Sequence, residues 1–255
     1  FGQVAETQTR YVKVSSLQSH FSAYGSERAW NNSYYEGLRW PADYPYQDNS
    51  VIKRTWIAAE NFEDATGYDW GHYGIYFALD YVGLSLFPME LTQSAKFNIP
   101  TVYVDGRDIH AVNADEIDEI NPDQIADRII TNVVNTSMGL TMTRKIYVFS
   151  QQYHDNYFIK EFTFTNTGNT DWDDEIELNA PLNGIRIGWG TRYSCGREGT
   201  LNIGDGQSWG KHSWVTVRGE NYTEHMNDVV DESNPIVDWL RSGFSWAGQS
   251  HVNGY

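Results

Sequence analysis

Hydrophobic and polar residues alternate almost without a break over residues 156–165, which read Asn-Tyr-Phe-Ile-Lys-Glu-Phe-Thr-Phe-Thr. One parity holds three aromatic residues and a single polar one: Phe158, Lys160, Phe162 and Phe164. A period of two, filled with aromatic and β-branched residues, is typical of a strand that buries one face. Turn-forming residues follow at 166–171, and residues 172–178 alternate again. The pattern predicts a hairpin of two β-strands joined by a tight loop.

The rest of the chain shows similar short hydrophobic runs, punctuated by Gly, Pro and Asn. We expect further strands at 11–14, 51–60, 101–104, 133–149, 179–193 and 214–218, and one or two within 73–87. Residues 88–100 read as a connector. Residues 122–132 begin with Pro and repeat Ile at helical spacing, which predicts a short helix, and a second is expected at 236–241. The sequence therefore predicts an all-β, mainly antiparallel, β-sandwich-like fold with long aromatic-rich loops and one or two short helices.

The length of 255 residues favours a single β-rich domain over residues 1–255. A division near residue 130 is the alternative, with a loop-rich β region at 1–130 and a β-sandwich region at 131–255. The first residue is Phe rather than Met, so we expect a processed product and the N-terminal part of a longer polypeptide.

The composition of the chain disfavours some classes of binding partner. The chain has 34 acidic and 18 basic residues, a formal net charge of −16, which disfavours nucleic acid and anionic membrane surfaces. No hydrophobic run reaches the length of a membrane helix, so we expect no membrane insertion. Cys195 is the one cysteine, which excludes an internal disulfide and a Cys-x-x-Cys metal site and leaves its role open. The 10 Trp and 17 Tyr residues outnumber the 11 Phe, as suits half-exposed sheets, interfaces and sugar-stacking surfaces.

Calcium is the one cofactor that the residues suggest, and the metal site itself stays unassigned. Four oxygen-bearing side chains alternate after the first predicted strand of the hairpin: Asn169, Asp171, Asp173 and Glu175. Hard cations favour such clusters, but Asp174 and Ala180 stand where an EF-hand needs Gly and Glu. A solvated acidic edge that blocks unwanted strand pairing is the alternative. Asp105 and Asp108 offer a second, weaker candidate.

No motif names a reaction, and we assign no catalytic or cofactor-binding residue. Glu161, Asp155 and Glu198 are nominal carboxylates for glycoside hydrolysis, but their linear spacing does not distinguish them from surface acids. His154-Asp155 resembles a base with its orienting acid, yet His-Glu-x-x-His is lacking in the sequence. Residues 206–210, Gly-Gln-Ser-Trp-Gly, match Gly-x-Ser-x-Gly in letters but fall in a predicted Gly/Asp-rich loop, so we expect no nucleophile elbow there. Three N-glycosylation sequons begin at Asn31, Asn135 and Asn221.

Several segments resemble a group of large secreted proteins of Bacteroidetes-like bacteria, many of which end in a type IX secretion sorting domain. The resemblance rests on residues 133–169, Tyr24-Gly-Ser-Glu-Arg-Ala-Trp, Trp40-Pro-Ala-Asp-Tyr-Pro-Tyr and Phe244-Ser-Trp-Ala-Gly. It implies export, a surface location and a longer parent chain. It implies no activity and no catalytic residue.

We therefore expect a non-enzymatic extracellular structural protein of a cell-surface matrix or filament. It would assemble through β-sheet contacts with copies of itself or with other surface proteins, and glycans are a further expected partner. The alternative is a carbohydrate-active enzyme or carbohydrate-binding module that acts on extracellular polysaccharide.

Overall fold

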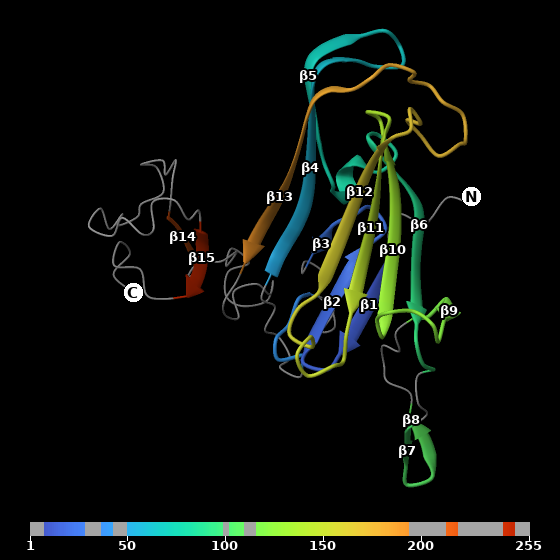
Figure 1. Cartoon of the computed structure of the whole chain (residues 1–255), viewed down its shortest axis with the longest axis vertical. Coiled ribbons are helices and arrows are strands. Elements are labelled where there is room, and N and C mark those ends of the chain that lie inside the picture. The colour runs from blue at the N-terminus through green and yellow to red at the C-terminus, as the bar shows by residue number, and fades with distance from the viewer. Residues whose placement is uncertain are drawn as a thin grey trace.

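The computed structural model describes residues 8–28, 37–42, 50–98, 102–109, 116–193, 213–218 and 242–247. The regular secondary structure of these residues is almost entirely β-strand, in mainly antiparallel sheets, which confirms the predicted all-β fold (Figure 1). The one helical element among them is the 3-10 turn η1 (Leu79–Tyr81). None of the described helical segments is long and apolar enough to span a membrane.

A five-stranded sheet forms one layer, in the order β12-β11-β10-β6-β9. Its strands are β6 (Leu86–Ala95), β9 (Glu119–Ile120), β10 (Arg128–Thr136), β11 (Leu140–Val148) and β12 (Ile159–Asn166). Neighbours pair antiparallel except β6 and β9, which pair parallel. Every second residue of β11 is buried, so this strand presents one face to the interior and the other to solvent.

The opposite layer contains a second sheet and a hairpin. The second sheet joins β3 (Glu27–Arg28), β4 (Ser50–Glu63), β5 (Asp69–Tyr76) and β13 (Asn183–Tyr193), with β4 in contact with the other three. The hairpin joins β1 (Thr9–Val14) and β2 (Leu17–Ser22). Two further hairpins pair β7 (Val102–Val104) with β8 (Arg107–Ile109), and β14 (Ser213–Arg218) with β15 (Ser242–Ala247).

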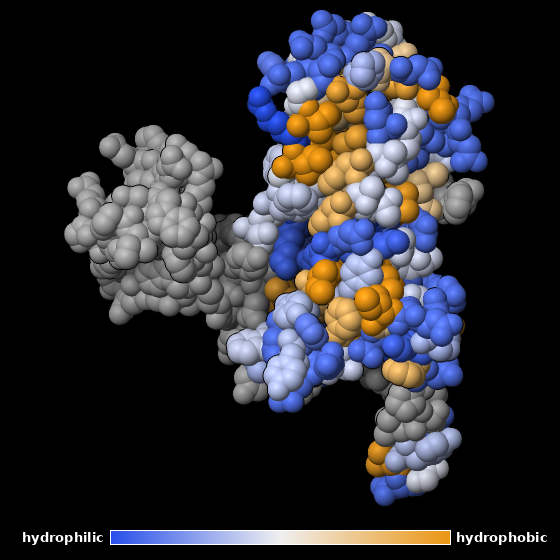
Figure 2. Space-filling model, in the orientation of Figure 1, coloured by the Kyte–Doolittle hydropathy of each residue, from blue (hydrophilic) through white to orange (hydrophobic). Residues whose placement is uncertain are grey.

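Two hydrophobic clusters hold the layers together. One packs β4 and β5 against β10 and β11 through residues such as Ile57, Ile75 and Met142. The other packs β1 and β2 against the same sheet, with Phe21 and Ile146 at its centre. On the face seen in Figure 2, hydrophobic residues gather over the upper half and hydrophilic residues cover the loops above it.

The predicted helix at 122–132 is wrong. Residues 122–127 form turns, and β10 begins at Arg128. Ile130 is buried in the core while Ile125 is 75% exposed, so the two do not share a buried face. The β-branched run from residue 129 pairs with both β6 and β11, and this tertiary pairing outweighs the helical spacing.

The first strand of the predicted 156–178 hairpin is confirmed as β12, but the second strand is wrong. Residues 172–178 form an irregular loop that returns to Gly168, whose carbonyl accepts the N–H groups of Glu177 and Leu178. Three side chains in this loop each accept the backbone N–H two residues ahead: Asn169, Asp171 and Asp173. These local bonds compete with a sheet ladder, which explains why the alternation does not produce a strand.

The predicted connector at 88–100 is also wrong, because β6 covers most of it and lies inside the sheet. Pro88 is tolerated there because the register with β10 shifts between Val133 and Val134, opposite this proline. The expected short helix at 236–241 lies outside the described residues. The single domain and the division near residue 130 stay predictions, and a division there would cut β10.

Candidate functional site

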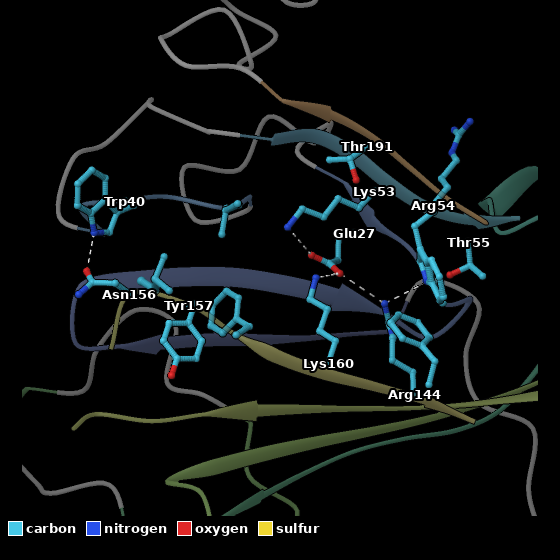
Figure 3. Close-up of a pocket in the computed structure, with 16 residues that line it drawn as sticks. Glu27, Trp40, Lys53, Arg54, Thr55, Arg144, Asn156, Tyr157, Lys160 and Thr191 are labelled. Atoms are coloured by element: carbon cyan, nitrogen blue, oxygen red, sulfur yellow. Dashed lines mark hydrogen bonds and ion pairs between the residues drawn. The ribbon is translucent and has the colours of Figure 1, made fainter. Parts of the chain in front are cut away.

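A cleft of about 660 Å³ lies where β4 and β13 face β12 (Figure 3). Strand residues supply its charged, hydroxyl and part of its aromatic lining: Glu27, Lys53, Arg54, Thr55, Arg144, Lys160, Phe162, Trp189 and Thr191. The segments 37–42 and 156–158 add further residues, including Trp40 and Tyr157, and Leu17 and Gly25 complete the lining. The volume lies within the range typical of small-ligand sites.

Strand register brings the charged residues together from distant parts of the sequence. Arg144 of β11 lies opposite Phe162 of β12, and both belong to the inner face of the five-stranded sheet. Lys160 is two residues before Phe162 and therefore points to the same side. Glu27 of β3 pairs with Lys53 of β4, on the facing sheet.

Glu27 is the centre of an ionic cluster, which we define as Glu27, Lys53, Arg144 and Lys160. The Lys160 ammonium donates a hydrogen bond to Glu27 Oε1. Lys53 Nζ lies 3.5 Å from Glu27 Oε2, and Arg144 Nη1 lies 3.8 Å from Glu27 Oε1. The cluster therefore joins four strands of the two facing sheets between the two hydrophobic clusters.

Arg144 is held by the backbone as well as by charge. Its guanidinium is buried and donates to the carbonyls of Gly25 and Ser22 and to Asn132 Oδ1, each at 3.1 Å. Its charged end and that of Lys160 lie 5.7 and 5.6 Å from the centre of the Phe21 ring. These contacts fix both cations in place before any ligand arrives.

Burial and charge act in opposite directions on the cluster. Burial alone would raise the pKa of Glu27, but the three surrounding cations outweigh it and lower this pKa to about 2. Burial lowers the pKa of Lys160 to about 8 and that of Arg144 to about 10, and attraction to Glu27 offsets burial only in part. Glu27 therefore stays ionised, whereas both cations would be stabilised by a second negative charge.

Exposed aromatic rings form the mouth of the cleft. Trp189 is 58% exposed and contacts Phe162, with ring centres 5.4 Å apart. Across the cleft, Trp40 donates from Nε1 to Asn156 Oδ1 at 2.7 Å, beside Tyr157 (Figure 3). A ligand in the cleft would meet ring faces at the entrance and cations at the floor.

The predicted calcium residues are only partly brought together. Carboxylate oxygens of Asp171, Asp173 and Glu177 lie within 4.8 Å of one another, whereas Glu175 is not in this group. Asn169 lies beside it, because its Oδ1 accepts the N–H of Asp171 and its Nδ2 donates to the Asp173 carbonyl. Glu177, which the sequence pattern placed outside the candidate set, accepts hydrogen bonds from the backbone and hydroxyl of Thr170. This group is the one candidate metal cluster in the described part of the chain. Asp105 lies in the β7–β8 turn, away from any such group of described residues.

The two nominal catalytic carboxylates that the structure describes, Glu161 and Asp155, have separate hydrogen-bond partners. Glu161 faces solvent and accepts from Tyr147, while Asp155 accepts from Ser15. His154 contacts Tyr157 through Nδ1 rather than the neighbouring acid. Glu198, Cys195 and the sequons at Asn31 and Asn221 lie outside the described residues. The third sequon asparagine, Asn135, is buried and donates to the Asp171 carbonyl, so it is closed to modification in the folded chain.

Sequence reasoning missed the cleft but contained one signal of it. Lys160 is the single polar residue on the hydrophobic parity of its strand, and this position points it into the cleft. Glu27 and Arg144 gave no such signal, because their roles depend on strand pairing between distant segments. No protein-family model, curated protein or solved structure matches the chain.

Proposed function

We propose that this protein is a non-enzymatic extracellular binding protein that takes an acidic saccharide in the cleft. The observation that supports this best is the combination of buried cations at the floor with exposed aromatic rings at the mouth. The extracellular location rests on the resemblance to secreted surface proteins and stays part of the proposal.

The charged residues at the floor of the cleft favour an anionic ligand. Even when Lys53 is not counted, Arg144 and Lys160 bring two positive charges against the single negative charge of Glu27. The lowered pKa of each cation means that its charged form is under-stabilised. A carboxylate or sulfate near Lys160 would supply the missing interaction as a charge-assisted hydrogen bond.

The aromatic residues at the mouth of the cleft favour a saccharide over a simple ion as the ligand. Trp40, Tyr157 and Trp189 offer ring faces of the kind on which pyranose C–H groups stack, and Thr55, Thr191 and Asn156 add hydroxyl and amide groups. The cleft volume of about 660 Å³ is far larger than an inorganic anion needs. A uronic-acid-containing chain has both the carboxylates and the rings that this lining matches.

Binding fits the cleft better than hydrolysis does. Among the described lining residues, Glu27 is the one carboxylate, and a retaining or inverting glycosidase works with two. A carboxyl whose pKa is lowered to about 2 is a poor proton donor at neutral pH, because it is almost never protonated. We therefore favour the binding-module form of the carbohydrate hypothesis.

Calorimetry with tetragalacturonate, and with its fully methyl-esterified form as the uncharged match, tests the proposal. We expect binding of the acid and much weaker binding of the ester. Lys160→Met should weaken binding by roughly 10-fold or more, the worth of one hydrogen bond to a charged group. Lys145→Met, which removes an exposed lysine from the outer face of β11, should leave it unchanged. Equal affinity for acid and ester, or equal loss in both variants, contradicts the proposal.

Assembly through sheet edges is a second candidate function, and one observation favours it. β12 ends the five-stranded sheet and has β11 on one side only, so its other edge has no strand partner among the described residues. An unpaired edge is a template for a strand from another chain. Sedimentation velocity and electron microscopy over a concentration series test this: reversible oligomers or filaments support it, and a monomer at every concentration contradicts it.

A further inference from the structure

The outer face of the β13-β4-β5 sheet carries a second aromatic surface, separate from the cleft. Side chains alternate along β4, so Thr55 and Ile57 are buried while Trp56, between them, is 47% exposed on the opposite face. Its partner on β5 is Tyr76, and the two rings stack with centres 4.7 Å apart. Arg54, the next outward residue on β4, lies 5.0 Å from the centre of the Tyr76 ring.

Glycines keep the sheet bare around this ring pair. Gly188 and Gly190 of β13 lie opposite Trp56 and Arg54 and share their outward face. A Cβ on Gly190 would come within 2.8 Å of Trp56 Nε1, so the indole edge rests against this glycine. A Cβ on Gly188 would meet nothing within 4 Å, so open space lies beside the exposed indole. In the next row, Ala58 pairs with Gly74, which continues the bare strip.

The geometry of this platform, defined as Trp56 and Tyr76 with Gly188 and Gly190, suits a flat and extended ligand. Three adjacent strands spaced about 4.8 Å apart make it roughly 10 Å across. Polyproline segments dock in aromatic-lined grooves, and the described residues form a sheet face here. Because Trp56 and Tyr76 each cover one face of the other, and Tyr76 also contacts Arg54 and Tyr81, a polymer with C–H faces would stack on the remaining face of Trp56 and continue over the glycines.

The charges at the platform are one ion pair and the guanidinium of Arg54, which lies over the Tyr76 ring. Arg186 Nη2 donates to Glu60 Oε1 at 2.7 Å, and this pair lies on the same outward face, beyond Ala58. Together these groups offer donors and an acceptor to the hydroxyl groups of sugar rings. They bring fewer cations than the cleft, so this surface depends less on a negative charge in its ligand.

We propose that the Trp56–Tyr76 platform is a second saccharide site, which binds an extended neutral β-1,4-linked chain. It lies on the opposite face of the sheet from the cleft, because the register pairs are Trp56 with Gly188 outside and Thr55 with Trp189 inside. The two sites are therefore independent, and this one does not require the acidic ligand of the cleft.

Calorimetry of the full 255-residue chain with cellohexaose tests the site, and maltohexaose is the control ligand because it has the same composition in a coiled form. Trp56→Ala should weaken cellohexaose binding by roughly 10- to 30-fold, the range for an anchoring tryptophan. Trp70→Ala is the matched control, since Trp70 is 48% exposed but lies near Tyr68 and Tyr73 instead. Gly188→Val should also abolish binding while the chain stays folded, because Val suits a strand and its side chain would fill the open space.

Four results would overturn the site. These are no binding of cellohexaose, equal binding of maltohexaose, equal losses for Trp56→Ala and Trp70→Ala, or unchanged binding by Gly188→Val. Lys160→Met should bind cellohexaose as the parent chain does, which separates this site from the cleft. A parallel titration with a proline-rich peptide completes the test, because peptide binding at Trp56 without sugar binding contradicts the proposal.

Discussion

The two faces of β11 and β12 carry similar charged groups in opposite settings. On the inner face, Arg144 and Lys160 surround the buried Glu27, and every pKa in this group is displaced. On the outer face, Lys145 lies opposite Glu161, which accepts a 2.7 Å hydrogen bond from Tyr147, and all three are in contact with solvent. Positions one residue apart thus differ in their surroundings, because desolvation is the largest single influence on the pKa of each inner residue and only a lesser cause of the raised pKa of Tyr147 on the outer face.

The same contrast divides β4. Thr55, Ile57 and Ala59 are buried against the five-stranded sheet, while Trp56 and Ala58 face outward beside glycines. The inner residues Ile57 and Ala59 pack in the core, whereas Thr55, on the same parity, also lines the cleft. The outer residue Trp56 lies beside the open space at Gly188. The binding roles proposed for β4 therefore fall on both of its faces.

The largest expected effect comes from removing the anion of the ionic cluster. Glu27→Gln leaves buried cations without a counter-charge and should lower the free energy of unfolding by about 3–5 kcal/mol. Lys160→Met should cost clearly less, because Glu27 keeps Lys53 and Arg144 as partners. Urea denaturation of both variants at pH 7 measures the difference. An equal or larger loss for Lys160→Met would show that the cluster does not have an excess of cations.

Acid titration of the parent chain checks the same cluster independently. The pKa of Glu27 is about 2 in the folded chain against an ordinary value of 4.5, so its contribution is complete above pH 4.5 and is lost as pH falls towards 2. A displacement of this size corresponds to about 3 kcal/mol. The Glu27→Gln variant should lack that part of the acid sensitivity, and an identical pH dependence in both chains would contradict this origin.

The next largest loss of stability is expected from a substitution on the inner face of β4, and a substitution on its outer face is the comparison. Ile57→Ala removes a side chain that is 2% exposed within the core and should cost about 2–5 kcal/mol. Trp56→Ala removes a larger but half-exposed ring and should cost about 1 kcal/mol, mainly its stacking on Tyr76. Thermal and urea unfolding measure both. If Trp56→Ala proves as damaging as Ile57→Ala, the ring is a structural residue and the platform loses its main support.

The period-two pattern was sufficient to predict the fold class and the course of individual strands. It identified β12 because Phe162 and Phe164 mark an inner face. The strand at 51–60 was predicted from its hydrophobic residues and is confirmed as part of β4, whereas the run at 133–149 spans the end of β10 and all of β11. The period-two pattern failed at residues 172–178, where Asn and Asp side chains satisfy the backbone locally. The helical spacing of Ile failed at 122–132, where tertiary pairing decides.

The cleft could not be predicted because its members come from segments far apart in the chain. Glu27 and Lys160 are separated by 133 positions and meet only when β3 and β12 face each other. Lys160 was visible as a polar residue on a hydrophobic parity, but nothing in the sequence named its counter-ion. The acidic loop was the more conspicuous pattern, yet of its three predicted carboxylates only Asp171 and Asp173 lie in the group that the fold assembles, and Glu177 joins them.

A smaller effect concerns the pH dependence of ligand binding. Burial lowers the pKa of Lys160 to about 8, so the cation that faces an acidic saccharide is complete well below pH 8 and is lost above it. The affinity for tetragalacturonate should therefore fall by roughly 10-fold between pH 6.5 and pH 9.5, the worth of one charged contact. Lys160→Met should bind weakly at both pH values with little dependence on pH. Calorimetry at the two values compares them, and a parent affinity that does not change would remove Lys160 from the site.

The smallest expected effect on stability lies on the outer face, where Tyr147→Phe removes the hydroxyl that donates a hydrogen bond to Glu161. The Tyr147 hydroxyl lies 2.7 Å from Glu161 Oε2, and this hydrogen bond raises the pKa of Tyr147, with burial as a lesser cause. Both groups face solvent, so water replaces the lost contact and the free energy of unfolding should fall by about 0.5 kcal/mol or less. Urea denaturation of Tyr147→Phe beside Glu27→Gln gives the ratio between an exposed and a buried carboxylate contact. A loss for Tyr147→Phe that approaches the loss for Glu27→Gln would mean that burial does not distinguish the two faces, and the argument for a poised cationic floor would fail with it.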